Sequence, residues 1–145
     1  MTTREVKDWL NRGYYVDKEI QNLKERRARL WQEINNVVPA YESDGTMFNP
    51  DIRSKEKKLA IYEELLEKLD ERITELRRLD AETQLYINKI TDSGLRLVVE
   101  LRSIERMNWR DISKRMHVVE RTAQRYFDDA LEELVTILEF YQFEF

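Results

Sequence analysis

Large apolar side chains recur at alternating spacings of three and four residues along residues 17–38. They are Ile20, Leu23, Leu30, Ile34 and Val37, and Arg27 occupies one position of the same series. This spacing is typical of the apolar stripe of a coiled-coil helix that runs for about three heptads. Pro39 cannot continue a helix, so we expect the first long helix to end there.

A second periodic stretch follows a segment rich in turn-forming residues. Residues 39–53 hold both prolines and one of the three glycines, which predicts a loop. Ser54 is the expected N-cap of the next helix, although Lys57 stands where a capping box has Glu. The apolar positions of this helix are Leu59, Tyr62, Leu66, Leu69, Ile73 and Leu76, continued by Leu79, Tyr86, Ile87 and Ile90. The two stripes fit an antiparallel hairpin within the chain and pairing between copies equally well.

The pattern is interrupted at residues 91–95, TDSGL, where Asp92 or Ser93 is suited to cap a new helix. Three shorter helices are predicted after it, at about residues 92–106, 109–116 and 120–141. The fold class is therefore all-α. We expect a helical, coiled-coil-like hairpin over residues 1–90 and a compact helical domain over residues 91–145.

Composition narrows the classes of function. Charged residues make up 37% of the chain, with three Gly and two Pro, as in proteins built from long solvent-facing helices. Without Cys and with one His, the chain offers no disulfide, thiolate site or common zinc site. No Gly-rich phosphate loop or nucleophilic triad is present either. We expect no cofactor, no metal and no catalysis.

Hydropathy indicates a soluble, cytoplasmic protein. No apolar run approaches the roughly 18 to 20 residues needed to span a bilayer. The first residues, MTTREVKDWLNRG, are too charged for a secretory signal.

Charge is unevenly distributed in this acidic chain of net charge −4. Residues 102–126 carry six Arg and one Lys against three acids, whereas residues 127–145 carry six acids and no base. A local basic segment indicates a polyanionic partner more strongly than the net charge argues against one.

The basic segment also has the pattern of a helix-turn-helix, in which a first helix braces a second that enters the major groove of DNA. The positions expected to face inward are apolar or small: Ile112, Ser113, Met116, Val118, Ala123 and Tyr126. The second helix leaves Glu120, Arg121, Thr122, Gln124 and Arg125 facing outward, and these side chains suit the reading of base edges. Residues placed to contact phosphates are Arg102, Arg110, Lys114, Arg115 and, in the turn, His117.

Residues 89–134, KITDSGLRLVVELRSIERMNWRDISKRMHVVERTAQRYFDDALEEL, resemble region 4 of bacterial sigma factors, and more closely the phage regulators of the ArpU and RinA type. Matching positions include Leu101, Arg102, Trp109 and Ile112, and then Arg121, Thr122 and Arg125. The N-terminal stretch VKDWLNRGYYVDKEIQNLKERRARLW also resembles the opening of small phage proteins with this domain. The resemblance implies a regulator of phage late genes that binds double-stranded DNA and contacts host RNA polymerase. This chain differs from the family at two positions. Val119 stands where the family has a capping Ser, and His117 stands where the family has Gly.

The last residues form an aromatic and apolar cluster: Ile137, Phe140, Tyr141, Phe143 and Phe145. This cluster either folds back onto Trp9, Tyr14 and Tyr15 or forms part of a subunit interface. We favour the interface, since DNA readers commonly dimerise.

Two other functions fit the same pattern. A small terminase subunit, which packages DNA, also joins a helix-turn-helix to an oligomerising helical region. Alternatively, the sigma-like domain binds polymerase or a sigma factor and never DNA, which the acidic C-terminal residues would suit.

Overall fold

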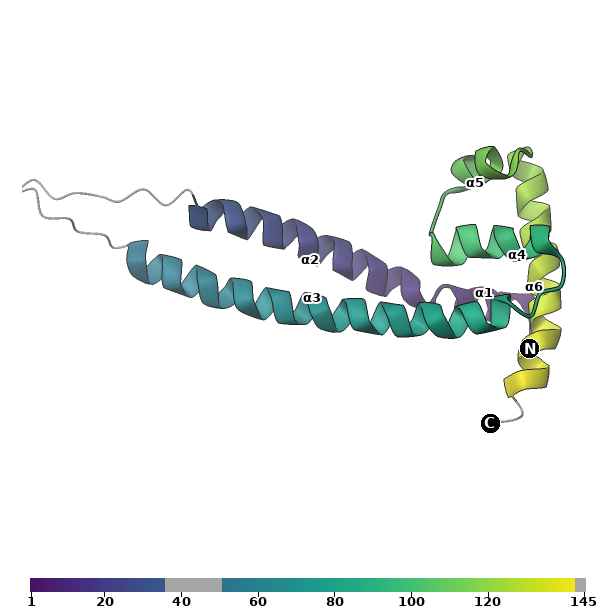
Figure 1. Cartoon of the computed structure of the whole chain (residues 1–145), viewed down its shortest axis with the longest axis horizontal. Coiled ribbons are helices and arrows are strands. Elements are labelled where there is room, and N and C mark those ends of the chain that lie inside the picture. Colours follow the sequence, from purple (N-terminus) through teal and green to yellow (C-terminus); the bar gives the residue numbers. More distant parts are fainter. Residues whose placement is uncertain (36–50, 143–145) are drawn as a thin grey trace, which may run out of the picture. The chain divides into compact units, whose positions relative to one another are not determined.

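The computed structural model describes residues 1–35 and 51–142, and within these ranges every regular element is a helix. The elements are α1 (Thr3–Leu10), α2 (Arg12–Asn35), α3 (Asp51–Ile87), α4 (Ser93–Val99), the π-helix η1 (Glu100–Ile104), α5 (Trp109–Met116) and α6 (Glu120–Gln142) (Figure 1). The predicted all-α class is confirmed. The helices form two compact units, Met1–Tyr15 with Leu76–Phe145 as the first and Val16–Glu75 as the second.

In the second unit, α2 and α3 run side by side in opposite directions, as an antiparallel hairpin within the chain (Figure 1). Ion pairs mark the register. Late in α2, the Glu33 carboxylate lies 4.0 Å from Nζ of Lys58, which is early in α3. The Glu19 carboxylate lies 3.8 Å from Nζ of Lys68 and 4.0 Å from Nη1 of Arg72. Exposed pairs of this kind contribute little free energy, so apolar contacts must hold the hairpin together.

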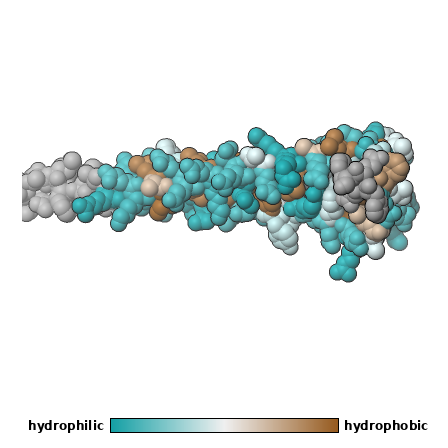
Figure 2. Space-filling model, turned by 90° about the horizontal axis from the view of Figure 1, so that it is seen from below, coloured by the Kyte–Doolittle hydropathy of each residue, from teal (hydrophilic) through white to brown (hydrophobic). Residues whose placement is uncertain are grey.

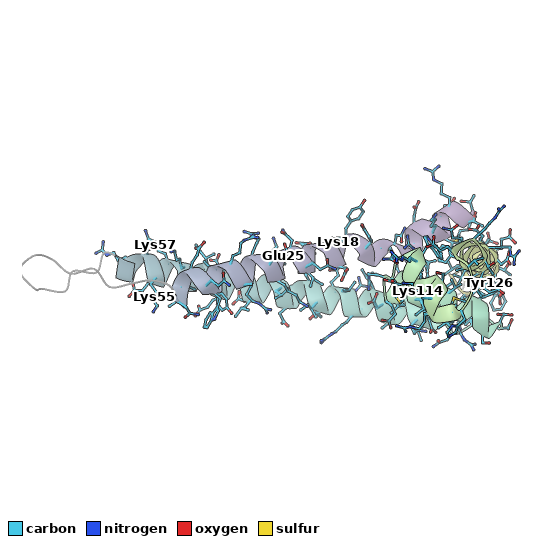
Figure 3. All side chains as sticks on the ribbon, turned by 90° about the horizontal axis from the view of Figure 1, so that it is seen from above. Lys18, Glu25, Lys55, Lys57, Lys114 and Tyr126 are labelled. Atoms are coloured by element: carbon cyan, nitrogen blue, oxygen red, sulfur yellow. The ribbon has the colours of Figure 1, made fainter. Side chains whose placement is uncertain are left out.

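The two helices meet along a seam of buried apolar side chains: Ile20, Leu23 and Ile34 of α2, and Leu65 and Leu69 of α3. Charged side chains such as Lys18, Glu25, Lys55 and Lys57 extend away from the helices (Figure 3). The predicted stripe on α2 is confirmed at Ile20, Leu23 and Ile34, which are buried. Arg27 and Leu30 are half-buried. Val37 lies outside the described residues.

On α3, the predicted stripe is confirmed at Leu69, which is 3% exposed, but it is wrong at Leu59 and Leu66. Leu65 is 8% exposed, whereas the predicted Leu59 and Leu66 are 37% and 38% exposed. Adjacent leucines at 65 and 66 both satisfy a three-four spacing, and only packing against α2 selects between them.

The predicted start of the second long helix is also wrong. The second helix begins at Asp51 rather than near Ser54, so Ser54 lies inside α3 and residues 51–53 are not loop. Proline disfavours a helical backbone in the residue before it and is tolerated only in the first turn, so the sequence at Pro50 is compatible with a start at this point. The rest of the predicted loop, residues 39–50, lies outside the described part. α2 begins at Arg12, earlier than the apolar stripe indicated.

The first unit has one apolar core, to which α1, the end of α3, α4, η1, α5 and α6 all contribute. Its fully buried members include Val6, Ile87, Val98, Ile112 and Leu134. Trp9 of α1 packs edge-on against Tyr86 of α3, with 5.4 Å between ring centroids. The hydroxyl of Thr2 caps α1 by accepting a hydrogen bond from the Glu5 N–H. α1 packs against α6 and so contributes to the core.

The unit that contains the predicted helix-turn-helix is therefore larger than residues 91–145. Met1–Tyr15 and residues 76–90 also belong to it, although the sequence placed both in the helical hairpin of residues 1–90. The apolar periodicity of α3 continues without a break from Leu59 to Ile90, so it carries no sign that its partner changes.

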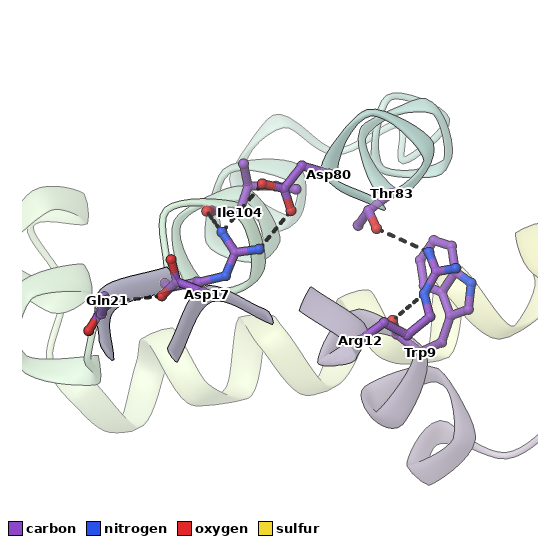
Figure 4. A network of polar contacts seen from close by, with 8 residues as sticks. Trp9, Arg12, Asp17, Gln21, Asp80, Thr83 and Ile104 are labelled. Carbon is purple, nitrogen blue, oxygen red and sulfur yellow. Dashed lines mark hydrogen bonds and ion pairs between the residues drawn. The ribbon is translucent and has the colours of Figure 1, made fainter. Parts of the chain in front are cut away.

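The predicted helix at residues 92–106 is regular only in its first half. Asp92 caps α4, its carboxylate accepting a hydrogen bond from the Leu95 N–H at 3.0 Å. The helix then widens into η1, which ends at Ile104, and two residues later Arg106 adopts a left-handed backbone with φ 57°. The guanidinium of Arg106 donates to both carboxylate oxygens of Asp80 and to the Ile104 carbonyl (Figure 4). These bonds anchor the segment that leads into α5.

Candidate nucleic-acid interface

The bracing helix, α5, begins where predicted. The side chain of Asn108 accepts a hydrogen bond from the Asp111 N–H at 2.8 Å and so caps the helix. Ile112 and Ser113 are buried, and the Ser113 hydroxyl donates to the Arg110 carbonyl at 2.7 Å. A small residue at position 113 lets α5 approach its neighbours closely.

The turn after α5 is closed by backbone hydrogen bonds around His117, which has φ 56° and ψ 41°. The His117 N–H donates to the Lys114 carbonyl at 3.3 Å, and the Val118 N–H donates to the Ser113 carbonyl at 3.1 Å. These two bonds form the Schellman arrangement, in which Gly usually occupies the left-handed position. His117 takes that position at a cost of about 1–2 kcal/mol of backbone strain.

α6 begins at Glu120, and its first turns pack inward through Ala123, Tyr126 and Phe127. The ring of Phe127 lies edge-on to Trp109 of α5, with 5.4 Å between centroids. The sequence prediction missed Phe127, which is 4% exposed. Its spacing of four residues from Ala123 was the signal that marks an inward position.

The outward face of α6 brings together four of the five predicted base readers. A shallow hollow is lined by Val119, Arg121, Thr122, Gln124, Arg125 and Asp128. Residues 121, 124, 125 and 128 recur at helical spacing, so they share one face. Glu120 is exposed but does not line the hollow. Asp128 was not predicted and adds a carboxylate beside the two arginines.

The outward face of α5 brings together three of the five predicted phosphate contacts. Lys114, Arg115 and His117 line a second hollow with Met107 and Asp111. Arg110 is exposed and lines neither hollow.

Arg102, the fifth predicted phosphate contact, is engaged within the protein. Its Nη1 donates to the Met107 carbonyl at 3.0 Å, and its guanidinium lies 4.9 Å from the centre of the Trp109 ring. These contacts brace the start of α5.

The cations of the first unit thus differ in what they contact. Arg12 donates to the Trp9 carbonyl and to Thr83 (Figure 4), and Arg106 pairs with Asp80. Among the described residues, by contrast, the side chains of Arg110, Lys114, Arg115, Arg121 and Arg125 form no hydrogen bond or ion pair. Cations with no internal role are free to meet an anionic partner.

The aromatic residues near the C-terminus are only partly accounted for by the first unit. Ile137 packs against the core, and Tyr141 lies beneath the Lys89 ammonium, 3.9 Å from the ring centre. Phe140 is 63% exposed and contacts Tyr141 edge-on. Phe143 and Phe145 lie outside the described residues.

No protein-family model, curated protein or solved structure matches the chain. Within the described ranges, none of the helices is long and apolar enough to cross a membrane. The same ranges hold no group of three or more His, Asp or Glu side chains placed to bind a metal ion.

Proposed function

We propose that the chain is a sequence-specific DNA-binding protein whose α5, turn and α6 act as a helix-turn-helix of the sigma region 4 type. The observation that carries the proposal is the set of cations on the outward faces of α5 and α6 whose side chains form no hydrogen bond or ion pair with the described residues. They stand on a rigid base, because the inward faces of both helices belong to the core. Preorganised Arg and Lys side chains are what a major groove and its flanking phosphates require.

The two outward faces contact different parts of the DNA. On α6, Arg121 and Arg125 suit guanine and Gln124 suits adenine, while Thr122 meets a thymine methyl or a phosphate. On α5, Lys114 and Arg115 bind backbone phosphates and so fix the orientation of α6 in the groove. Asp128 limits the sites accepted, because a carboxylate repels phosphate and favours a cytosine amino group.

The biological role that follows is transcriptional regulation of phage or prophage genes, in particular late genes. Such a regulator works at the nucleoid, in the cytoplasm of the bacterial host, with host RNA polymerase as a further partner. The resemblance of residues 89–134 to sigma region 4 is the ground for this role.

Selection of bound sequences from a random pool of duplex DNA, with the purified full chain, tests the proposal. We expect one enriched motif whose binding weakens steeply with salt, because phosphate contacts release counterions. Recovery of no motif, together with salt-insensitive binding to polymerase, would instead favour the protein-binding alternative. A ring of about eight or more subunits that binds DNA without a motif would favour a packaging adaptor.

A further inference from the structure

The second unit carries more apolar surface than one hairpin can bury. Six large apolar side chains occur within eleven residues of α3, namely Leu59, Ile61, Tyr62, Leu65, Leu66 and Leu69. A helix that contacts a single partner needs only a narrow seam, whereas a helix inside a bundle has a stripe about twice as wide. Within this unit α3 has α2 as its partner, and Ile61 remains 53% exposed.

The uncovered part of the stripe lies in a groove along one side of the hairpin. Its apolar floor comprises Leu30 of α2 and Ile61 and Leu65 of α3. Hydrophobic side chains reach the surface of the hairpin among hydrophilic ones in Figure 2. Leu59 and Leu66 are turned toward the other side of α3, since residues 61 and 66 are about 140° apart around a helix.

The rims of the groove carry both signs of charge. Arg26 and Arg29 with Glu33 line it from α2, and Glu64 with Lys68 lines it from α3. A nucleic acid or a uniformly charged peptide would meet repulsion from one part of such a rim. A second copy of the same groove offers both signs in return, so the surface is complementary to itself.

We propose that a second copy of this chain docks its α2–α3 hairpin into the groove and completes a four-helix bundle. In that bundle Ile61 is buried between the hairpins. The proposal places self-association on the hairpin rather than on the aromatic C-terminal residues. It stands independently of whether the chain binds DNA.

Mass in solution, measured by sedimentation on the full chain, tests the proposal. We expect the wild-type chain to associate. We expect Ile61→Asp to raise the dissociation constant about a hundredfold, because the interface would bury an unpaired carboxylate. Leu85→Asp is the matched control, since Leu85 lies on the same helix outside the groove and is 64% exposed. Helix content by circular dichroism shows that each variant folds.

Thiol reactivity locates the contact. The chain has no Cys, so Ile61→Cys and Leu85→Cys each carry one thiol. We expect the thiol at position 61 to react with a maleimide more slowly as protein concentration rises, and the thiol at 85 to react at a constant rate. A monomeric wild type, an assembly that Ile61→Asp leaves intact, or equal reactivity of Cys at position 61 at all concentrations would overturn the proposal. So would dissociation by Leu66→Asp but not Ile61→Asp.

Discussion

Arg106 and Asp80, 26 residues apart in sequence, are joined by two hydrogen bonds, the shorter of 2.7 Å between Nη2 and Oδ1. Their side chains are 17% and 27% exposed, so the pair is shielded from most of the solvent. Because Arg106 has a left-handed backbone and directly precedes the segment leading into α5, this ion pair anchors that segment to α3. The candidate DNA-binding surface thus depends on a contact with α3.

Removing the carboxylate should destabilise the first unit. We expect Asp80→Ala to lower the free energy of unfolding by about 1–3 kcal/mol, since a partly buried guanidinium loses its charged acceptor. Urea denaturation of the full chain measures the change. Asp70→Ala, at an exposed position of the same helix, is the control and should change stability by less than about 0.5 kcal/mol. Equal effects of both substitutions would show that the ion pair does not matter.

Gly13 leaves space for the same guanidinium. A Cβ at this position would lie 2.6 Å from Arg106 Nη2 and 2.9 Å from Leu76 Cδ1. Gly13→Ala in a helix ordinarily stabilises by about 0.5–1 kcal/mol. Here we expect the opposite sign, a lower melting temperature, because the added methyl group pushes Arg106 away from Asp80. A rise in melting temperature would contradict the packing described.

The sequence predicted local features better than distant contacts. The predicted bounds of α5 and the predicted start of α6 are confirmed, because they depend on residues within a few positions of each helix end. The family that residues 89–134 resemble has Gly in the turn, and His117 adopts the left-handed backbone that Gly takes easily. The contact between Arg106 and Asp80 has no local signal, and neither does the choice of Leu65 over Leu66, because both depend on which helices meet in three dimensions. The outward positions of the candidate site were found because helical spacing alone separates them from the core.

The turn offers a test of backbone strain. His117 has a positive φ that Gly adopts freely and that β-branched residues adopt poorly. We expect His117→Gly to stabilise the chain by about 0.5–1 kcal/mol and His117→Val to destabilise it by at least as much. The melting temperatures of the two variants and of the wild-type chain give the order of stability. Destabilisation by Gly would mean that the His117 side chain makes contacts that outweigh the strain.

Phosphate contacts by α5 predict a change in salt dependence. Each phosphate bound contributes about 0.9 to the slope of log affinity against log salt. We expect the double variant Lys114→Ala, Arg115→Ala to reduce the magnitude of that slope by about 2, with the preferred DNA sequence unchanged. Fluorescence anisotropy over a series of salt concentrations measures it. A slope equal to that of wild type would remove α5 from the DNA interface.

If the outward face of α6 reads DNA, as we propose, substitutions on that face must weaken binding to the selected DNA site. We predict that Arg121→Ala and Arg125→Ala each weaken specific binding by about 1–3 kcal/mol, roughly fivefold to 150-fold in Kd, and relax the preference at one base pair. Arg77→Ala removes the same charge from an exposed position of α3 and should leave Kd unchanged. Wild-type affinity in both α6 variants, with the chain folded, would contradict the account.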